Sequence, residues 1–274
     1  KYEKALVRML LPQKNLSWFI SYRVIVDRQM NFNVQLSNVV GIAIIACGKP
    51  YLDFAQKLVS GIRKKVNLGL TLKVFVLTDQ SEKSLIAFQG LDVTFIKIAP
   101  MQWPEAAVYR YEIINKNLGN QELTHIIYMD ADLEIIDFID ETNFPLNEDM
   151  FCTAHPGYFN RNIFYKLLRK LYYPPWETSV KFSCAVPFFR RKTYIASGLW
   201  GGKKDYIIQM CKYLSKLTDI DVSKNRYPRS YDESYLNFWV SIHNQIKILS
   251  PKFLFAQEFP WLKNISNPKI LAVQ

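Results

Sequence analysis

The sequence predicts an α/β protein in which a mostly parallel sheet is flanked by helices. Between residues 39 and 136, short apolar runs alternate with segments of helical periodicity, as in nucleotide-binding α/β units. With 49% hydrophobic and 15% aromatic residues, the composition is that of a folded globular protein. At 274 residues, the chain is long enough for one large domain of this class.

The elements of the first half follow from their patterns. Apolar runs rich in Val, Ile and Phe predict buried strands, and apolar residues three or four apart predict helices that pack on them. The predicted strands cover residues 39–48, 72–79 and 93–98, and a fourth begins at residue 126 and ends at two aspartates. The predicted helices cover residues 51–66 and 106–118.

Beyond residue 150, short apolar pieces are joined by turns that contain Pro or Gly. Such turns are predicted at residues 155–157, 174–175 and 197–202. A helix over residues 204–217 follows, and a segment from Tyr231 continues as a helix or a strand towards Ile248. Since no repeat or low-complexity linker interrupts the chain, we expect one domain over residues 39–274, preceded by an N-terminal extension over residues 1–38.

The charge of the chain limits its partners. Thirty-five Lys and Arg residues against 24 acids give a net charge of +11, which favours polyanions or an anionic membrane surface. No nucleic-acid-binding motif organises this charge, so we expect no nucleic-acid partner. The basic amphipathic residues 1–11 belong to an extension that we expect to pack on the main domain or to face a membrane peripherally. The four cysteines are scattered without metal-like spacing, and no run is long enough to span a membrane.

Asp130 and Asp132 form the central motif. They follow a predicted buried strand, and ligands of α/β sheets bind beyond the carboxyl ends of the strands. On an extended chain, residues two apart point the same way, so both carboxylates are expected to reach one cation. Oxygen ligands suit Mg²⁺ or Mn²⁺, which share their coordination with phosphates. The alternative is a pair of solvated turn residues that end the strand.

Other segments offer weaker signals. The turn over residues 46–51 lies beside the Asp-x-Asp strand in such a sheet and is either a plain turn or a nucleobase contact. His155 lies in a Pro- and Gly-containing turn, where a structural role competes with a ligand contact. Asp232 and Glu233 begin an apolar helix, where acids favour the helix dipole. They are also the carboxylates that would stabilise an oxocarbenium-like transition state.

Together these motifs carry a resemblance to glycosyltransferase family 6, the family of the ABO blood-group transferases, the α1,3-galactosyltransferase and the Forssman synthase. The similarity covers residues 41–251. The matching segments are residues 76–80, 130–132, 155–158, 198–202, 232–237 and 249–251. The resemblance implies a GT-A fold, a UDP-sugar donor, Mn²⁺ (or Mg²⁺), and retaining transfer that forms an α1,3 bond to galactose-type acceptors on an oligosaccharide or glycolipid. Residues 39–150 would then bind the UDP-sugar and residues 151–274 the acceptor.

The resemblance also implies roles for individual residues. Asp130 and Asp132 match the metal ligands, and Glu233 matches the proposed nucleophile or transition-state stabiliser. The remaining matched positions are Cys47, Tyr51 and Ala131 for uridine, Arg110 for the donor, His155 and Asp232 for acceptor and donor sugar, and Ala196 and Gly198 for discrimination between sugars. The last two are small, so an acetamido group should fit, and UDP-GalNAc is favoured over UDP-Gal.

Several positions depart from the family pattern. Thr178 and Ser179 stand where the family has arginines, and residues 190–192 are basic where the family has an acidic segment. Ser230 stands in the place of a tryptophan, and Ala256 in the place of an aspartate. The alternative function is therefore a weak or inactive relative that binds glycans or UDP. The start at Lys1 and two glycosylation sequons, at Asn15 and Asn264, suggest a Golgi luminal domain cut from its membrane anchor; a bacterial cytoplasmic enzyme is the alternative.

Overall fold

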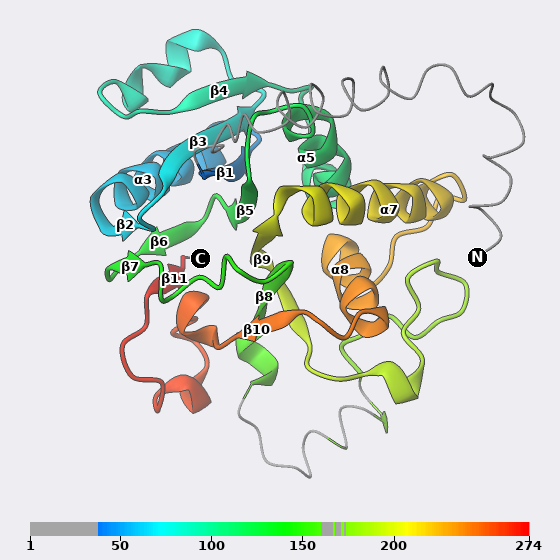
Figure 1. Ribbon diagram of the computed structural model, residues 1–274. Helices are drawn as coiled ribbons and strands as arrows, with labels where there is room; N and C mark the ends of the chain where they lie inside the picture. The colour runs from blue at the N-terminus through cyan, green and yellow to red at the C-terminus, as the bar shows by residue number, and fades with distance from the viewer. Residues whose placement is uncertain (1–37, 160–166, 168–170, 173, 274) are drawn as a thin grey trace, which may run out of the picture. The chain divides into compact units, whose positions relative to one another are not determined.

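The computed structural model describes residues 38–159, 167, 171–172 and 174–273. The expected extension over residues 1–38 therefore lies outside the described residues, apart from Asn38. Seven strands form a sheet in the order β10-β8-β9-β5-β1-β3-β4 (Figure 1). Their bounds are β1 Val39–Ala46, β3 Thr71–Thr78, β4 Thr94–Lys97, β5 His125–Asp130, β8 Met150–Ala154, β9 Ile195–Lys203 and β10 Lys247–Leu249.

The predicted parallel half is confirmed. Strand β1 pairs in parallel with β3 on one side and with β5 on the other, and β3 pairs in parallel with β4. All eight residues of β1 are buried, as expected for a central strand covered on both faces. Helix α3 (Lys49–Lys65) follows β1 and buries Leu52, Ala55, Leu58, Val59 and Ile62, the predicted apolar stripe.

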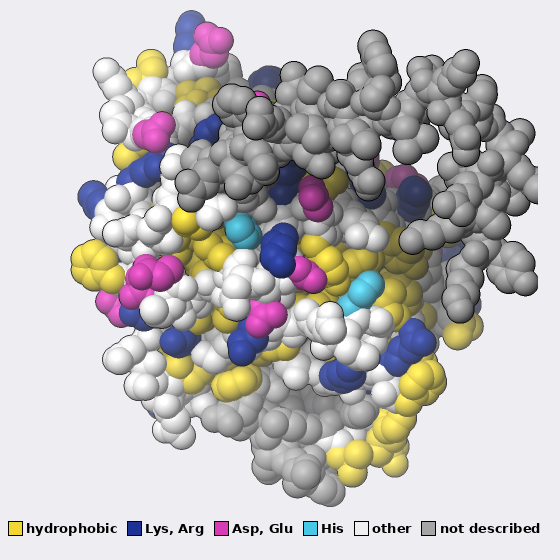
Figure 2. Space-filling view, viewed as in Figure 1, with side chains coloured by type: hydrophobic (Ala, Val, Ile, Leu, Met, Phe, Trp, Pro, Cys, Tyr) yellow, Lys and Arg dark blue, Asp and Glu magenta, His cyan; other side chains and the backbone are white. Residues whose placement is uncertain are grey.

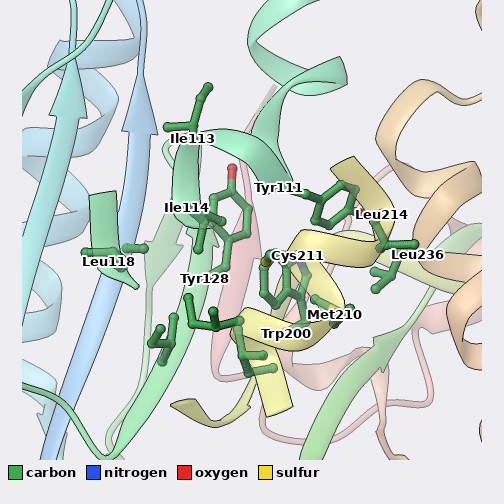
Figure 3. Packing of buried hydrophobic residues seen from close by; sticks show 14 of the residues in the cluster. Tyr111, Ile113, Ile114, Leu118, Tyr128, Trp200, Met210, Cys211, Leu214 and Leu236 are labelled. Atoms are coloured by element: carbon green, nitrogen blue, oxygen red, sulfur yellow. The ribbon is translucent and has the colours of Figure 1, made fainter. Parts of the chain in front are cut away.

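Helices cover both faces of the sheet. Helix α3 shares a buried cluster with Ile42 and Ile44 of β1. The other face packs against α5 (Arg110–Leu118), α7 (Lys204–Val222) and α8 (Tyr231–Ile242). Tyr128 of β5 and Trp200 of β9 stack at 5.1 Å between ring centroids at the centre of that layer (Figure 3). The predicted helix over residues 106–118 is divided at Tyr109 into α4 (Glu105–Val108) and α5.

The glycine-rich turn predicted over residues 197–202 is wrong. Those residues lie within strand β9, which pairs antiparallel with both β5 and β8. A Cβ atom on Gly201 would lie 2.8 Å from the Ile126 carbonyl oxygen, and one on Gly202 only 2.1 Å from the Asp149 oxygen. The glycines are therefore explained by close approach of neighbouring backbones within the sheet, and not by chain reversal.

Smaller elements complete the domain. Two-residue strands β2 (Val66–Asn67) and β7 (Ile139–Asp140) pair in parallel, and β6 (Leu133–Ile135) pairs antiparallel with β11 (Ile270–Ala272). In the described part of the chain, five 3₁₀ segments connect the larger elements: η2 Glu82–Phe88, η3 Pro156–Tyr158, η4 Phe188–Arg190, η5 Pro251–Phe253 and η6 Pro260–Leu262. No helix in the described ranges is long and apolar enough to cross a membrane.

Candidate functional site

A cavity of about 240 Å³ opens where strands β1 and β5 end. This is the edge of the sheet at which ligands of α/β proteins bind. Seven of the predicted site residues line it: Cys47, Tyr51, Arg110, Asp130, Ala131, Asp132 and Asp232. The four that do not line it are His155, Ala196, Gly198 and Glu233.

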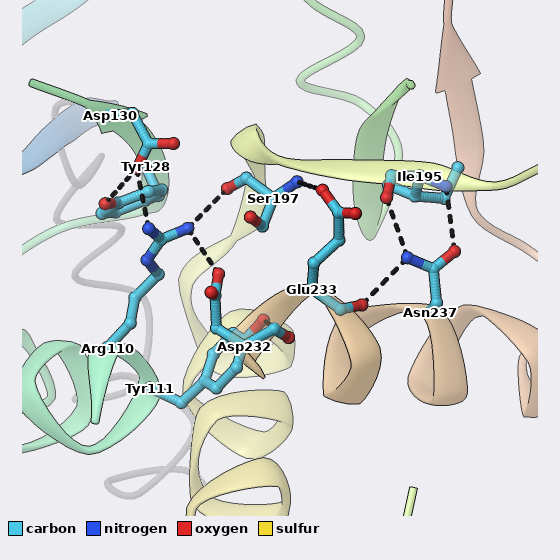
Figure 4. A network of polar contacts seen from close by, with 9 residues as sticks. All are labelled: Arg110, Tyr111, Tyr128, Asp130, Ile195, Ser197, Asp232, Glu233 and Asn237. Atoms are coloured by element: carbon cyan, nitrogen blue, oxygen red, sulfur yellow. Dashed lines mark hydrogen bonds and ion pairs between the residues drawn. The ribbon is translucent and has the colours of Figure 1, made fainter. Parts of the chain in front are cut away.

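Arg110 connects three separate segments at this cavity (Figure 4). Its guanidinium forms ion pairs with Asp130 at 2.8 Å and with Asp232 at 2.7 Å, and donates a 2.9 Å hydrogen bond to the Ser197 carbonyl. It also lies 4.5 Å from the ring centroid of Tyr128. Burial alone would lower the pKa of Arg110, but the two carboxylates raise it well above its usual range, so the side chain stays charged.

The Asp-x-Asp motif lies in a turn. Strand β5 ends at Asp130, and Ala131 and Asp132 form the turn that leads into β6. The expected extended geometry is therefore wrong beyond Asp130, yet both carboxylates line the same cavity. Asp130 Oδ1 accepts a 2.7 Å hydrogen bond from the Tyr128 hydroxyl. The Val273 amide donates a 2.9 Å hydrogen bond to the Asp132 carbonyl, which ties the turn to the segment after β11.

The two aspartates are a suitable donor set for a hard cation. Burial, together with the negative charge of Asp130, raises the pKa of Asp132 to about 6, as expected for two carboxylates that share one site. Among the described residues, no group of three or more His, Cys, Asp and Glu side chains is placed to hold a metal ion. The protein would thus supply two carboxylates and leave the other positions to water and phosphate oxygens, as is usual for Mg²⁺.

Asp232 and Glu233 lie in the first turn of α8, as predicted. Asp232 is 5% exposed, and the Tyr111 hydroxyl donates a 2.9 Å hydrogen bond to its carbonyl. Glu233 Oε2 accepts a 3.2 Å hydrogen bond from the Ser197 amide. Burial raises the pKa of Glu233 to about 8, with the charge of Asp232 acting in the same direction. Glu233 is therefore mostly protonated at neutral pH before any ligand binds.

Asn237 holds α8 against β9. Its Oδ1 accepts a 2.9 Å hydrogen bond from the Ile195 amide, and its Nδ2 donates to the carbonyls of Ile195 at 2.8 Å and Glu233 at 2.9 Å. This arrangement, one helical turn after Glu233, fixes the carboxylate opposite the Ser197 backbone (Figure 4).

Gly198 and Ala196 lie on β9 beside this network. A Cβ atom on Gly198 would lie 2.9 Å from Asp130 Oδ2, so this position is directly adjacent to the carboxylate. Ala196 is 3% exposed and belongs to the buried cluster that also contains Leu254. Gly198 therefore borders the Asp130 carboxylate directly, whereas Ala196 is buried among apolar side chains two residues earlier on the same strand.

His155 lies outside the cavity, at the N-cap of η3. Its Nδ1 accepts a 3.0 Å hydrogen bond from the Gly157 amide, and burial lowers its pKa to about 4, so the ring is neutral at physiological pH. The ring centroid lies 5.6 Å from that of Tyr194. Because Tyr194 interacts with Glu233, His155 borders the far side of the same region.

The turn after β1 is held by a residue that sequence reasoning did not assign. The Gly48 amide donates a 2.8 Å hydrogen bond to Asp79 Oδ1, and Gly48 adopts φ 79°. Asp79 directly follows β3, the strand beside β1. This bond fixes the turn next to Tyr51, which is 42% exposed at the cavity.

Further residues of the cavity were missed. Trp103 and Tyr231 line it and form an edge-to-face pair with centroids 5.2 Å apart, although 128 positions separate them. Trp103 is 67% exposed. The sequence shows only a tryptophan just before a predicted helix; its exposure and its pairing with Tyr231 depend on the tertiary fold.

Three of the positions that depart from the family pattern, Thr178, Ser179 and Ser230, form local contacts through their backbone amides. Glu177 is 7% exposed and accepts 2.8 Å hydrogen bonds from the amides of Thr178 and Ser179, and a 3.1 Å bond from the Arg229 amide. Ser230 lies at the N-cap of α8, and its amide donates to the Ser234 hydroxyl at 3.2 Å. The Glu177 carboxylate thus joins two loops around the start of α8.

Comparison with known proteins agrees with this geometry. A family model described as glycosyltransferase family 6 matches residues 22–274. The O-antigen biosynthesis glycosyltransferase WbnI of Escherichia coli is 24% identical over 81% of this chain and 89% of that protein. Globoside alpha-1,3-N-acetylgalactosaminyltransferase 1 of Gallus gallus is 24% identical over 82% of this chain and 64% of that protein. Histo-blood group ABO system transferase 1 of Rattus norvegicus is 23% identical over 92% of this chain and 75% of that protein. The chain therefore belongs to glycosyltransferase family 6, as its motifs predict, and is a glycosyltransferase with a GT-A-like fold.

Proposed function

We propose that the protein transfers GalNAc or Gal from a UDP-sugar to a galactose-type glycan acceptor, with retention of configuration and formation of an α1,3 bond. The observation that carries the proposal is the Arg110 network. It joins Asp130, at the end of β5, to Asp232, at the start of α8, and to the Ser197 carbonyl, while the amide of Ser197 binds Glu233. Carboxylates for a metal ion and for glycosyl chemistry thus border one region.

The donor would enter the cavity with its diphosphate towards Asp130 and Asp132. A divalent ion bound there, Mn²⁺ or Mg²⁺, would neutralise the departing diphosphate. Tyr51 and the backbone after β1 would contact the uridine, since they line the same cavity beside Ala131. Arg110 would keep Asp130 and Asp232 oriented by its paired contacts while the donor binds.

Glu233 would stabilise or attack the anomeric centre. A carboxylate is required for either role, because the oxocarbenium-like transition state carries positive charge. With a pKa of about 8, Glu233 gains its charge only as pH rises or as a nearby positive charge develops. We expect kcat/KM for the donor to rise with pH towards a plateau above pH 8, and the Glu233→Gln variant to lose this rise together with most of its turnover.

The choice of donor sugar would depend on Ala196 and Gly198. Ala196 has only a methyl group and Gly198 has no side chain, which would leave room for an acetamido group and favours UDP-GalNAc. The relative from Gallus gallus is named as an N-acetylgalactosaminyltransferase, which supports this choice. Changing Ala196 to Met should shift the preference between UDP-GalNAc and UDP-Gal. An unchanged ratio of kcat/KM values would argue against its place at the sugar.

The direct test is release of UDP from each donor in the presence of Mn²⁺, with a panel of galactose-terminated acceptors. The proposal expects metal-dependent turnover that Asp130→Asn abolishes. A folded protein that binds UDP or glycan without turning over either donor would instead support the alternative, an inactive relative. The Lys203→Gln variant is a control, since Lys203 forms an exposed ion pair with Asp149 away from the cavity.

A further inference from the structure

One loop exposes aromatic side chains on the acceptor-side half of the chain. The loop comprises residues 187–193 and contains η4. Phe189 is 77% exposed and Phe188 is 45% exposed. A single exposed apolar residue is ordinary, but two adjacent aromatic side chains at one loop tip form a contiguous apolar surface of the kind that meets an apolar partner. None of the residues of this 187–193 loop lines the cavity described above.

The aromatic pair is followed by three cations. Arg190 and Lys192 are exposed, and in the described part of the chain neither forms an ion pair with an acid. Lys192 Nζ contacts Asn244 Oδ1 at 2.7 Å, and the Arg190 guanidinium lies 5.8 Å from the Phe189 ring centroid. Figure 2 shows hydrophobic side chains along its lower right edge with Lys and Arg side chains close by, where the lime-coloured segment of Figure 1 lies.

The loop has a firm base. The Arg190 amide donates a 3.0 Å hydrogen bond to the Pro187 carbonyl, and Arg191 Nε donates a 3.1 Å bond to the Val186 carbonyl. The Val186 amide donates in turn to the Glu177 carbonyl at 2.7 Å. These bonds hold the tip in a defined shape, so its exposed aromatic rings require little ordering when they meet a partner.

We infer that the 187–193 loop docks on an anionic phospholipid membrane. Aromatic rings that enter the headgroup boundary, with cations beside them that meet lipid phosphates, are the chemistry of interfacial membrane contacts. The net charge of +11 is complementary to such a surface. A protein groove would have to neutralise the same cations with acids of its own.

The position of the loop gives this docking a consequence. The loop leads directly into β9, and Ser197 and Gly198 lie only four and five residues after Thr193. A membrane that contacts the loop would therefore lie near the strand that borders Glu233. An acceptor held at a lipid surface would be presented close to this site, but the membrane contact itself does not depend on the transferase reaction.

Sedimentation of the full chain with vesicles tests the inference. Vesicles of phosphatidylcholine alone are compared with an equal mixture of phosphatidylcholine and phosphatidylglycerol. We expect binding to the anionic vesicles only. The Arg190→Gln/Lys192→Gln variant should lower the partition coefficient about 30-fold, since each cation near an anionic surface contributes about fivefold. Phe189→Ser should lower it about tenfold.

Matched variants distinguish this loop from the rest of the basic surface. Lys212→Gln/Lys216→Gln removes two exposed cations of α7, and Ile86→Ser removes a 68% exposed apolar side chain of η2. Both should bind vesicles like the wild type. The inference is overturned if no vesicle binds, if the α7 variant weakens binding as much as the loop variant, or if the loop variants bind normally because other residues make the contact.

Insertion depth can be measured independently of affinity. The four native cysteines are buried, so a cysteine introduced by Phe189→Cys can be labelled selectively with an environment-sensitive fluorophore. Its emission should shift to shorter wavelength on anionic vesicles, while the label of an Ile86→Cys control should not change. Equal responses of the two labels would contradict docking through this loop.

Discussion

Replacing Arg110 by Met measures how strongly the site depends on its central cation. Met has a similar length and no charge, so the change removes both ion pairs and the hydrogen bond to Ser197 with little change in volume. The carboxylate of Asp232, only 5% exposed, is then left without its positive partner. Asp130 is less affected because its side chain is 28% exposed and can gain water.

The expected loss in the free energy of unfolding is about 3–5 kcal/mol, the usual cost when one partner of a buried ion pair is removed. Most of this cost comes from the uncompensated charge of Asp232 and not from the lost attraction. The double variant Arg110→Met/Asp232→Asn should therefore be more stable than Arg110→Met alone, by about 2 kcal/mol. Such a recovery would be absent if Arg110 contributed only through packing.

Urea unfolding followed by tryptophan fluorescence at 25 °C gives these free energies. The matched control is Lys203→Gln, which removes an ion pair of similar length, 2.9 Å, whose side chains are 50% and 48% exposed. It should cost no more than about 1 kcal/mol. Two results would contradict this explanation. One is that Arg110→Met lowers the free energy of unfolding as little as Lys203→Gln does. The other is that the double variant Arg110→Met/Asp232→Asn is less stable than Arg110→Met alone.

Three further predictions concern β9 and Glu233. Gly202→Ala should lower the free energy of unfolding by at least about 3 kcal/mol, because its Cβ atom would lie 2.1 Å from a backbone oxygen at φ 154°. Gly69→Ala, at φ 64° with no atom within 4 Å, should cost only about 1 kcal/mol, and equal losses would argue against the close strand contact. Gly198→Ala should fold, but its new methyl group would lie 2.9 Å from Asp130 Oδ2. Titration calorimetry should therefore show that UDP–Mn²⁺ binds about tenfold more weakly. Unchanged affinity would show that Gly198 does not border the metal site. The pKa of Glu233 is about 8 in the folded protein and 4.5 in the unfolded chain. The unfolded chain therefore releases this proton first as pH rises, and the ligand-free wild type should lose on the order of a few kcal/mol of its free energy of unfolding between pH 4.5 and pH 8. Glu233→Gln should remove that loss in urea titrations at pH 5 and pH 9, and identical slopes for the two proteins would refute the raised pKa.

The nucleotide-binding half could be predicted because its signals are local. Strand β1 is a continuous apolar run, β5 is one between His125 and Asp130, and α3 shows an uninterrupted helical stripe. The prediction that residues 93–98 form a buried strand is wrong, because β4 lies at the edge of the sheet and its four residues are exposed or half-buried. The edge at which Asp130 lies follows from the general rule for α/β sheets. The acids at the start of α8 were also visible, since they precede an apolar helical segment.

The second half was harder to predict because its elements depend on distant neighbours. Glycine normally weakens a strand, so the sequence of β9 favours a turn until β5 and β8 are known to lie on either side of it. Likewise, 87 positions separate Arg110 from Ser197, and 121 separate Tyr111 from Asp232. No local pattern records those contacts, so the role of Arg110 came from the family resemblance alone.

The proposed function depends most on Asp130 and Asp132, which we propose bind a divalent ion together with the diphosphate of a UDP-sugar. A crystal grown with Mn²⁺ and UDP, measured at the manganese absorption edge, tests it most directly. We expect an anomalous difference peak in contact with both carboxylates and with diphosphate oxygens. A bound nucleotide whose diphosphate lies away from these two residues, with the manganese peak elsewhere or missing, would contradict it.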